Sequence, residues 1–399
     1  RCSARSDVPD QIMSTPRTLA FLAATLWCAF AIVSAEFTLE LKREAGLSAR
    51  NPTNDRALLD GIVAKYLRNA ESYYRNTGKH AQFVNSTKLK KRGWLGKASL
   101  SMLEQNWNVQ LEFGSDKQKL YVKFDTGSPD VVMDGRGYDP STSSTAKDLD
   151  TPFEAGYGSA HAAGKVYTDT IAMGGIEAKD VWISVSDDPF LTMNRDAGLI
   201  GLSWPVLSSL YSRETTFYEA FKQQKRLRRN VYQFTLKSHA TSHLDVGHVN
   251  RLRFLGILGW VSVNPDDGYW KTDVNINGDD YTGIIDTGTT LIVANNEKMK
   301  SLLSKLDGVT LKQDDEGNYQ GWYDCKKPPK ISFRVGGKRF TMPRKTMKYW
   351  QNGNECRLPF TGLDGFSDWI FGTPFLEMAS VVFDFDNARL GFASQSWLP

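Results

Sequence analysis

A short motif occurs twice in this chain, and its repetition constrains the fold more than any other feature. The stretch KFDTGS at 123–128 returns as IIDTGTT at 284–290. Each copy is followed, at a similar distance, by two apolar residues and a glycine, Gly201 in one case and Gly372 in the other. A single Asp-Thr-Gly is most simply a strand that runs into an Asx-type turn. Two matched copies instead indicate two lobes of one design.

Both copies place an aspartate within an apolar run. Asp125 follows Val122 and Phe124, residues of the kind that fill buried strands. A buried carboxylate is costly unless it is paired or hydrogen-bonded. If an approximate two-fold axis relates the lobes, Asp125 and Asp286 meet across it. Two such carboxyls cannot both ionise cheaply, so we expect them to share one proton and to titrate as a unit.

A one-proton pair of aspartates is suited to amide hydrolysis. The ionised member can take a proton from a bound water while the protonated member donates to the carbonyl oxygen, so no covalent intermediate is needed. The glycines of the two motifs allow the backbones to approach closely, and the hydroxyls that follow can bind the outer carboxylate oxygens. The supporting residues are Thr126, Gly127, Ser128, Thr287, Gly288 and Thr289. This chemistry requires no metal, nucleotide or other cofactor.

The residue pattern of the chain from Gly93 onward predicts an all-β fold. Short segments of alternating apolar residues are separated by turn signals, and only 216–229 and 296–306 have good helical patterns. The basic end of the first of these helices is interpreted as a solvated helix C-terminus.

The front of the chain has the pattern of a targeting sequence. Residues 13–35 combine a basic start, an apolar run and small residues before Ala35, which predicts a secretory signal peptide. An uncleaved signal anchor is the alternative for this segment. Residues 1–12 are an upstream extension of uncertain status.

Residues 36–92 are interpreted as a basic pro-segment. Residues 1–92 hold 15 Lys and Arg against 8 Asp and Glu, whereas the remainder holds 34 against 37. A helical pattern places one apolar face on Leu58, Leu59, Ile62, Val63, Tyr66 and Leu67. The segment ends near the dibasic pair Lys91-Arg92, a type of site that kexin-like convertases cut. A nuclear-localisation signal would conflict with the signal peptide, and the mildly acidic body does not suit a nucleic-acid binder.

Cysteine usage agrees with export. Only Cys325 and Cys356 lie in the body of the chain. In an exported protein the two most simply pair, and the closed loop is worth roughly 3 kcal/mol in the chain-entropy model. Metal ligation by two thiols alone is disfavoured.

His239, His243 and His248 are interpreted as surface histidines, because their spacing does not place three imidazoles on one side of a strand.

The body resembles a pepsin-family aspartic protease of eukaryotes over nearly all of residues 100–398. Besides the two triplets, the stretches that carry the resemblance are WNVQLEFGSDKQ at 107–118, YDPSTSST at 138–145, FEAGYGSAHAAGKVYTDT at 153–170, HLDVGHVN at 243–250, GYW at 268–270 and VVFDFDNARLGFA at 381–393. The resemblance implies a bilobal all-β fold with a cleft, few short helices, synthesis as a zymogen, and Asp125 and Asp286 as the catalytic pair. It also implies a disulfide between Cys325 and Cys356.

The resemblance further implies a flap, a hairpin that covers the cleft. The 153–170 stretch matches it, with Tyr157 as the flap tyrosine and Gly158 beside it. This sequence departs from the family there, because Val132 stands where a tryptophan usually braces the tyrosine, and the hairpin is one residue short. We expect a looser flap, or a brace from another tryptophan.

These observations predict an aspartic endopeptidase made as a zymogen and sent to the secretory pathway, either for secretion or for an acidic vacuolar or lysosome-like compartment. Residues 93–258 are the expected N-terminal lobe and 259–399 the C-terminal lobe. The expected partners are peptide or protein substrates and the chain's own pro-segment, with a monomeric state and no stable membrane anchor unless the signal stays uncleaved. The alternative is a pepsin-fold binding protein that has lost catalysis.

Overall fold

The computed structural model describes residues 35–43, 52–85, 107–157, 160–187, 197–210, 216–238 and 240–396. The predicted signal peptide up to Ser34 and the dibasic pair Lys91-Arg92 lie outside the described residues. Among the described helices, none is both long enough and apolar enough to cross a bilayer.

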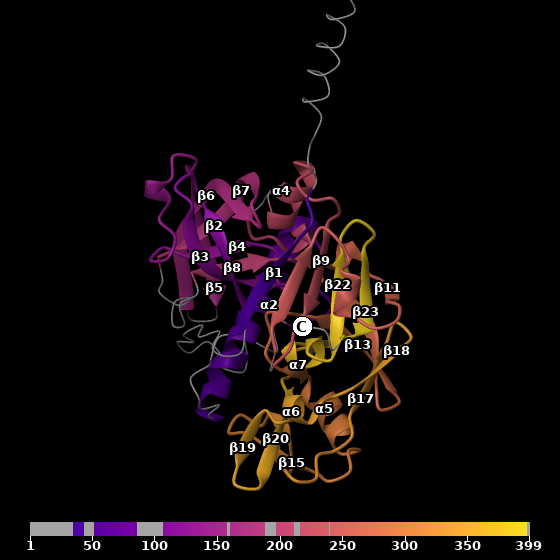
Figure 1. Cartoon of the computed structure of the whole chain (residues 1–399). Coiled ribbons are helices and arrows are strands. Elements are labelled where there is room, and N and C mark those ends of the chain that lie inside the picture. Colours follow the sequence, from indigo (N-terminus) through magenta and orange to yellow (C-terminus); the bar gives the residue numbers. More distant parts are fainter. Residues whose placement is uncertain are drawn as a thin grey trace, which may run out of the picture.

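Two β-sheets make up most of the molecule (Figure 1). The larger has the strand order β11-β23-β22-β9-β10-β1-β2-β3-β8-β4-β7-β6-β5. Its strands are β1 (Phe37–Arg43), β2 (Trp107–Phe113), β3 (Gln118–Asp125), β4 (Val131–Asp134), β5 (Lys147–Tyr157), β6 (Ala160–Met173), β7 (Ile176–Ser186), β8 (Gly198–Gly201), β9 (Val231–Thr235), β10 (Ser242–Val246), β11 (Gly259–Ser262), β22 (Ala379–Asp384) and β23 (Arg389–Ser394).

The smaller sheet has the order β15-β16-β20-β14-β21-β13-β12-β17-β18, with β19 paired to β20. Its strands are β12 (Lys271–Ile276), β13 (Asp279–Ile285), β14 (Ile292–Ala294), β15 (Val309–Gln313), β16 (Tyr319–Asp324), β17 (Ser332–Val335), β18 (Lys338–Thr341), β19 (Trp350–Asn352), β20 (Glu355–Gly362) and β21 (Trp369–Phe371). The predicted all-β, two-lobed architecture is thereby confirmed.

The helices in the described part of the body are short. They are α4 (Phe217–Gln223), α5 (Asn296–Leu303), α6 (Arg344–Met347) and α7 (Thr373–Leu376), with 3-10 turns η1 (Pro140–Thr142), η3 (Pro205–Leu207), η4 (Arg251–Arg253) and η5 (Pro265–Asp267). The pattern at 216–229 predicted a longer helix than α4. The helix stops early because Lys225 adopts a φ of 51°, in the left-handed region that ends a helix. The basic residues after it therefore lie on a connecting segment.

The two Asp-Thr-Gly motifs lie in equivalent strand arrangements. β3 pairs in parallel with β8, placing Asp125 opposite Gly201, and β8 pairs antiparallel with β4. In the other half, β13 pairs in parallel with β21, placing Ile285 opposite Phe371, and β21 pairs antiparallel with β14. The internal repeat read from the sequence is thus a repeat of strand pairing.

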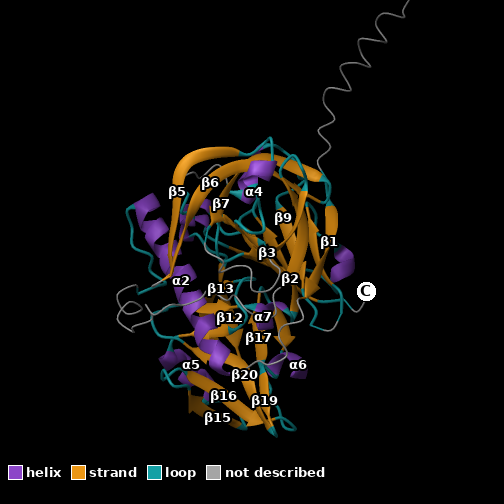
Figure 2. Cartoon of the chain, turned by 90° about the vertical axis from the view of Figure 1, so that its left-hand side faces the viewer, coloured by secondary structure: helices purple, strands orange, loops and turns teal. Residues whose placement is uncertain are grey.

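The one long described helix, α2 (Pro52–Thr77), belongs to the predicted pro-segment. Figure 2 shows α2 running from the level of β5 and β6 down toward β16 and β20. Its predicted apolar face is buried, except that Leu58 is only partly covered. This face packs into an apolar cluster with residues of the C-terminal half, including Ile284, Leu291 and Ile370. The strand β1, also from this segment, pairs with both β10 and β2.

Candidate active site

Asp125 and Asp286 lie where the two equivalent strand arrangements meet. Asp125 is the last residue of β3, and Asp286 directly follows β13. Their backbones are fixed by the neighbouring strands, since Leu202 N donates to Asp125 O at 2.8 Å and Asp286 N donates to Phe371 O at 3.0 Å. The two residues are only 2% and 0% exposed. The fold therefore buries both carboxyls at one place.

The middle threonines of the triplets tie the two halves together. Thr126 Oγ1 donates to Ile285 O at 2.9 Å, and Thr287 Oγ1 donates to Phe124 O at 2.7 Å. Each hydroxyl also accepts from the backbone N–H of the other threonine, at 3.0 and 2.9 Å. Because the four bonds are buried and reciprocal, they hold the two triplets in a fixed relation.

Each carboxylate is held by the residues that follow it. The N–H of Gly127 donates to Asp125 Oδ1 at 2.9 Å, and Ser128 Oγ donates to Oδ2 at 2.5 Å. In the second motif, Gly288 N donates to Asp286 Oδ1 at 2.8 Å, and Thr289 Oγ1 donates to Oδ2 at 2.6 Å. These donors favour the ionised form of either carboxyl.

The glycines of the triplets are required by close approach. A Cβ at Gly127 would lie 2.6 Å from Cγ of Asp286, and a Cβ at Gly288 would lie 2.2 Å from Oδ1 of Asp125. Each loop thus packs directly against the carboxyl of the opposite half. Any larger residue at either position would push the two aspartates apart.

A lysine of helix α2 occupies the space between the two carboxylates. Lys65 Nζ lies 3.1 Å from Asp125 Oδ1 and 2.7 Å from Asp286 Oδ2, and its side chain is only 2% exposed. The neighbouring Tyr66 donates its hydroxyl to Asp286 Oδ2 at 2.9 Å. One ammonium of helix α2 therefore bridges the two carboxylates, and all three side chains are buried.

The charges at this site are mutually dependent. Burial alone would lower the pKa of the Lys65 ammonium, but the charges of Asp125 and Asp286 outweigh burial and raise it. Burial raises the pKa of Asp125, an effect that the Asp286 charge reinforces and the Lys65 charge opposes. Burial would also raise the pKa of Asp286, but the Lys65 charge and the hydrogen bonds to Asp286 outweigh it and lower that pKa. Asp286 is therefore the more readily ionised member of the docked pair.

Further contacts fix α2 across the site. Asn69 Nδ2 donates to Gly127 O at 2.7 Å, directly beside Asp125. The ring of Tyr66 stacks on Tyr269 at 5.5 Å and meets Phe366 edge-on at 5.5 Å. At the C-terminal end of α2, Asn76 Nδ2 donates to two backbone carbonyls at 2.9 Å each, next to η3. Helix α2 thus contacts both the N-terminal and the C-terminal half of the body around the carboxyl pair.

The sequence pattern does not single out Lys65, because a lysine on an amphipathic helix is ordinarily solvated. The sequence feature that could identify Lys65 as a buried residue is its position on the helix. Residues 62, 65, 66 and 69 share one helical face, and Ile62 and Tyr66 mark that face as apolar. A lysine within an apolar face needs a buried anionic partner, and the paired aspartates of the body are the evident candidates.

The predicted flap stretch forms a β-hairpin. Strands β5 and β6 pair with Tyr157 opposite Ala160 and Gly156 opposite His161. The Tyr157 side chain and Gly158 lie outside the described part of the structure. Val132 is fully buried on β4. Helix α2 contacts β5, so the hairpin and α2 lie against each other.

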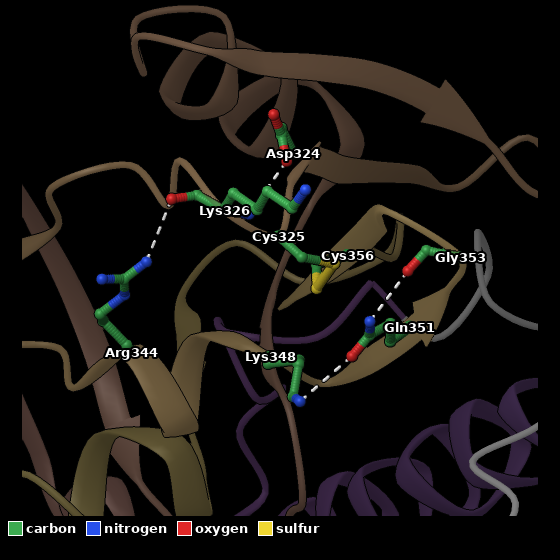
Figure 3. Close-up of a disulfide and its surroundings, with 8 residues drawn as sticks. All are labelled: Asp324, Cys325, Lys326, Arg344, Lys348, Gln351, Gly353 and Cys356. Carbon is green, nitrogen blue, oxygen red and sulfur yellow. Dashed lines mark hydrogen bonds between the residues drawn. A yellow bond between two sulfur atoms is a disulfide. The ribbon is translucent and has the colours of Figure 1, made fainter.

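The predicted disulfide between Cys325 and Cys356 is present (Figure 3), with a Cα–Cα distance of 5.1 Å. It joins the end of β16 to β20, two strands that also pair with each other.

Of the three histidines considered above, His243 and His248 are partly buried and His239 lies outside the described residues. Within the described ranges, no group of three or more His, Cys, Asp or Glu is placed to hold a metal ion.

Comparisons with known proteins agree with the geometry. A family model described as eukaryotic aspartyl protease matches residues 106–395. Secreted aspartyl protease 1 of Malassezia globosa is 31% identical over 395 residues, covering 96% of this chain and 99% of that protein. Penicillopepsin-1 of Talaromyces stipitatus is 28% identical and aspergillopepsin-1 of Aspergillus clavatus 27%, each covering 69% of this chain and 76% of the relative.

Proposed function

The chain belongs to the eukaryotic aspartyl protease family, and we propose that it is an aspartic endopeptidase whose two catalytic groups are Asp125 and Asp286 and whose pro-segment, residues 36–92, inhibits it until removal. The observation that carries the proposal is the placement of Lys65 Nζ within hydrogen-bonding distance of both carboxylates. A group at this point excludes a water molecule from the position where two aspartates can activate it.

In the active form, a water molecule replaces the lysine ammonium between the carboxyls. The pair holds one proton. Its ionised member takes a proton from the water as the water oxygen attacks the peptide carbonyl, and its protonated member donates to the carbonyl oxygen. The tetrahedral intermediate then collapses with protonation of the leaving nitrogen. Ser128 holds Oδ2 of Asp125 and Thr289 holds Oδ2 of Asp286 through these steps.

The proposed flap supplies cover for the substrate. Closing the β5–β6 hairpin over the site would exclude water and orient the peptide against the carboxyl pair. Tyr157, at the last described position of β5, is the residue we assign to contact with substrate. Helix α2 contacts the same hairpin in the inhibited form, which supports its competition with substrate for this place.

Removal of the pro-segment is proposed to follow cleavage after Arg92, and the mature enzyme to act in the secretory pathway or outside the cell. The name of the Malassezia globosa relative describes a secreted protease. Its match extends over nearly the whole of this chain, the pro-segment included, which supports a shared route of synthesis.

Single substitutions Asp125→Asn and Asp286→Asn, made in the processed protein, test the catalytic assignment. Each removes the one-proton pair but preserves side-chain shape. We expect hydrolysis of a peptide library at acid pH to fall at least a thousandfold, as it does when an essential acid–base group is lost. Unchanged circular dichroism and thermal unfolding verify the fold. Substantial activity in either pure, folded variant would overturn the two-aspartate mechanism.

A further inference from the structure

Positive charge in the C-terminal half of the body is concentrated in one short span. Residues 325–348 hold nine Lys and Arg and no Asp or Glu. The other residues of the body, 93–324 and 349–399, hold 25 Lys and Arg against 37 Asp and Glu. A span of one sign on an otherwise acidic body creates a local positive potential, which attracts anionic partners.

Most of these cations are exposed, and six of them define what we call the basic surface. Eight of the nine side chains are exposed, and that of Lys338 is half-buried. Within the described ranges, no carboxylate forms an ion pair with any member of the basic surface, which consists of Lys326, Lys330, Arg334, Arg339, Arg344 and Lys345. Their charges are therefore available to an anionic partner.

Three members of the basic surface lie on one face of the β17–β18 hairpin. Arg334 is directly opposite Arg339 in the strand register, and both side chains are exposed. Lys330 continues the same face, because buried residues alternate with more exposed ones from Lys330 to Arg334, a length of about 13 Å. Like charges directly opposite each other destabilise a strand pair. An anion bound to both guanidinium groups would replace this repulsion by attraction.

The other members lie next to this hairpin, on the turn after β16 and on α6. Only residues 342 and 343 separate β18 from α6. Arg344 Nη2 donates to Lys326 O at 3.1 Å, so α6 is tied to the turn beside the disulfide (Figure 3). Since the disulfide joins the same turn to β20, this part of the surface is held in place covalently.

The carboxylates that border the basic surface have other partners. Each of them accepts from a neutral donor or pairs with a cation outside the basic surface. They are Asp280, which accepts from Asn275 Nδ2 at 2.7 Å, Asp324, which accepts from the backbone N–H of Lys326 at 2.9 Å, Glu355, which pairs with Lys312, and Glu377, which accepts from Thr346 Oγ1 at 2.9 Å.

Cations on an outer strand also discourage pairing with a further strand. That role requires charges on β18 alone, whereas the basic surface extends to the turn after β16 and to α6. Protection of a sheet edge therefore does not account for the whole surface.

The composition of the surface favours a hydrated polyanion over a protein or a single-stranded nucleic acid. The described residues expose four large apolar side chains, and none of them lies within 325–348. Protein interfaces centre on buried apolar and aromatic groups, and single-stranded nucleic acids stack their bases on aromatic rings. Arginine, in contrast, binds tetrahedral oxyanions through paired N–H donors without an apolar contact.

We propose that the basic surface binds linear sulfated polysaccharides. Arg334 and Arg339 hold one sulfate group between them, and Lys330, Lys326 and Arg344 bind sulfates farther along the chain. The Cys325–Cys356 disulfide beside the surface belongs to oxidising surroundings, such as the secretory pathway or the outside of the cell. Sulfated polysaccharides occur there, whereas nucleic acids do not. The surface supplies no group to the carboxyl pair, so binding holds the protein on a polysaccharide without altering its chemistry.

Titration calorimetry of the purified full chain with heparin, a sulfated polysaccharide, tests the proposal. Chemically desulfated heparin is the comparison, at low and at physiological salt. We expect heparin binding that weakens with salt, and binding to the desulfated polymer that is about tenfold weaker or less. Arg334→Gln with Arg339→Gln should raise the Kd for heparin about tenfold or more and lower the slope of log K against log salt by about 1 to 2.

Lys119→Gln with Lys222→Gln is the matched control, because it removes two exposed cations elsewhere and lowers the net charge equally. We expect it to leave the Kd within about twofold of the parent. Heparin should raise the Tm of the parent and of this control more than that of the arginine variant. The Tm without heparin verifies that each variant is folded.

All variants should hydrolyse soluble peptides as the parent does, which separates this proposal from the proposed catalytic mechanism. Equal heparin affinity of the arginine variant and the control would overturn the proposal. The assignment of the partner would be overturned if desulfated heparin bound as tightly as heparin, or if duplex DNA or polyglutamate bound more tightly.

Discussion

Replacing Lys65 by methionine in the full chain isolates the contact that we propose to hold the enzyme inactive. Methionine keeps the length and apolar stem of the side chain but removes the ammonium between the carboxyls. Asp286 then loses its nearest cation, at 2.7 Å, while remaining buried. Removing one partner of a buried ion pair typically costs about 3–5 kcal/mol, because the other charge is left uncompensated.

The carboxyl can limit this cost by taking up a proton. Protonation costs about 1.36 kcal/mol for each pH unit that the pH lies above the carboxyl's pKa. The cost is therefore larger at neutral pH than in acid. The variant should therefore weaken docking of α2 by about 3–4 kcal/mol at neutral pH, or a factor of several hundred, and by little near pH 4.

The affinity for a statine-type inhibitor such as pepstatin measures how readily α2 leaves the carboxyl pair, and it does not require turnover at neutral pH. The proform is made resistant to processing by Lys91→Ala and Arg92→Ala, and Lys79→Met serves as the matched control, since Lys79 is an exposed lysine of the same segment. We expect Lys65→Met to tighten inhibitor binding a hundredfold or more at about pH 7. Binding no tighter than in the parent would refute the reasoning, provided that the processed enzyme from the same chain binds the inhibitor normally.

Four further variants test other parts of the structure. Burial raises the pKa of Asp60 to about 6, so the ionised carboxylate opposes docking of α2 at pH 7. Asp60→Asn should therefore tighten docking by about 1 kcal/mol at pH 7, after allowance for solvent screening, and hardly change it at pH 4. Weaker docking of this variant at pH 7 would contradict the reasoning. Gly288→Ala should lower kcat/KM about a hundredfold or more, since its Cβ would lie 2.2 Å from an Asp125 oxygen, and an unimpaired enzyme would show that the loop can yield. Cys325→Ser with Cys356→Ser should lower the free energy of unfolding by roughly 3 kcal/mol, measured by urea denaturation, with no loss contradicting the assigned role. Tyr157→Ala should lower kcat/KM about tenfold or more; unchanged kinetics on several peptides would move the substrate contact elsewhere.

The internal repeat made the arrangement around the carboxyl pair predictable. The spacing of each Asp-Thr-Gly from its Gly201 or Gly372 partner, together with apolar strands on either side, indicates two equivalent halves. The confirmed pairing of β3 with β8 and of β13 with β21 follows from that pattern. The disulfide was predictable for a simpler reason, because an exported body with two cysteines has one pairing to make.

Other features depend on contacts that sequence periodicity does not encode. The early end of α4 reflects the left-handed conformation of Lys225, which a helical pattern does not reveal. The burial of Lys65 depends on two carboxylates more than fifty residues away in sequence, so the helix alone predicts a solvated lysine. The segment of β1 alternates apolar and polar residues, as a strand does, but its place between β10 and β2 depends on tertiary pairing that this pattern does not encode.

Acid acts on the docked pro-segment through two carboxyls whose pKa values are displaced in opposite directions. The pKa of Asp286 is lowered from 3.8, so its contribution to docking is present above that pH and is lost as the pH falls through the lowered value. The pKa of Asp60 is raised to about 6, so its contribution is present below 3.8 and is lost as the pH rises through 6. Mild acid therefore strengthens docking at Asp60 before stronger acid weakens it at Asp286. Because Asp286 is fully buried while Asp60 is partly solvated, the carboxyl pair dominates at the lowest pH. If residues 36–92 act as the proposed pro-segment, we expect their cleavage, rather than acidification alone, to activate the enzyme in a mildly acidic compartment.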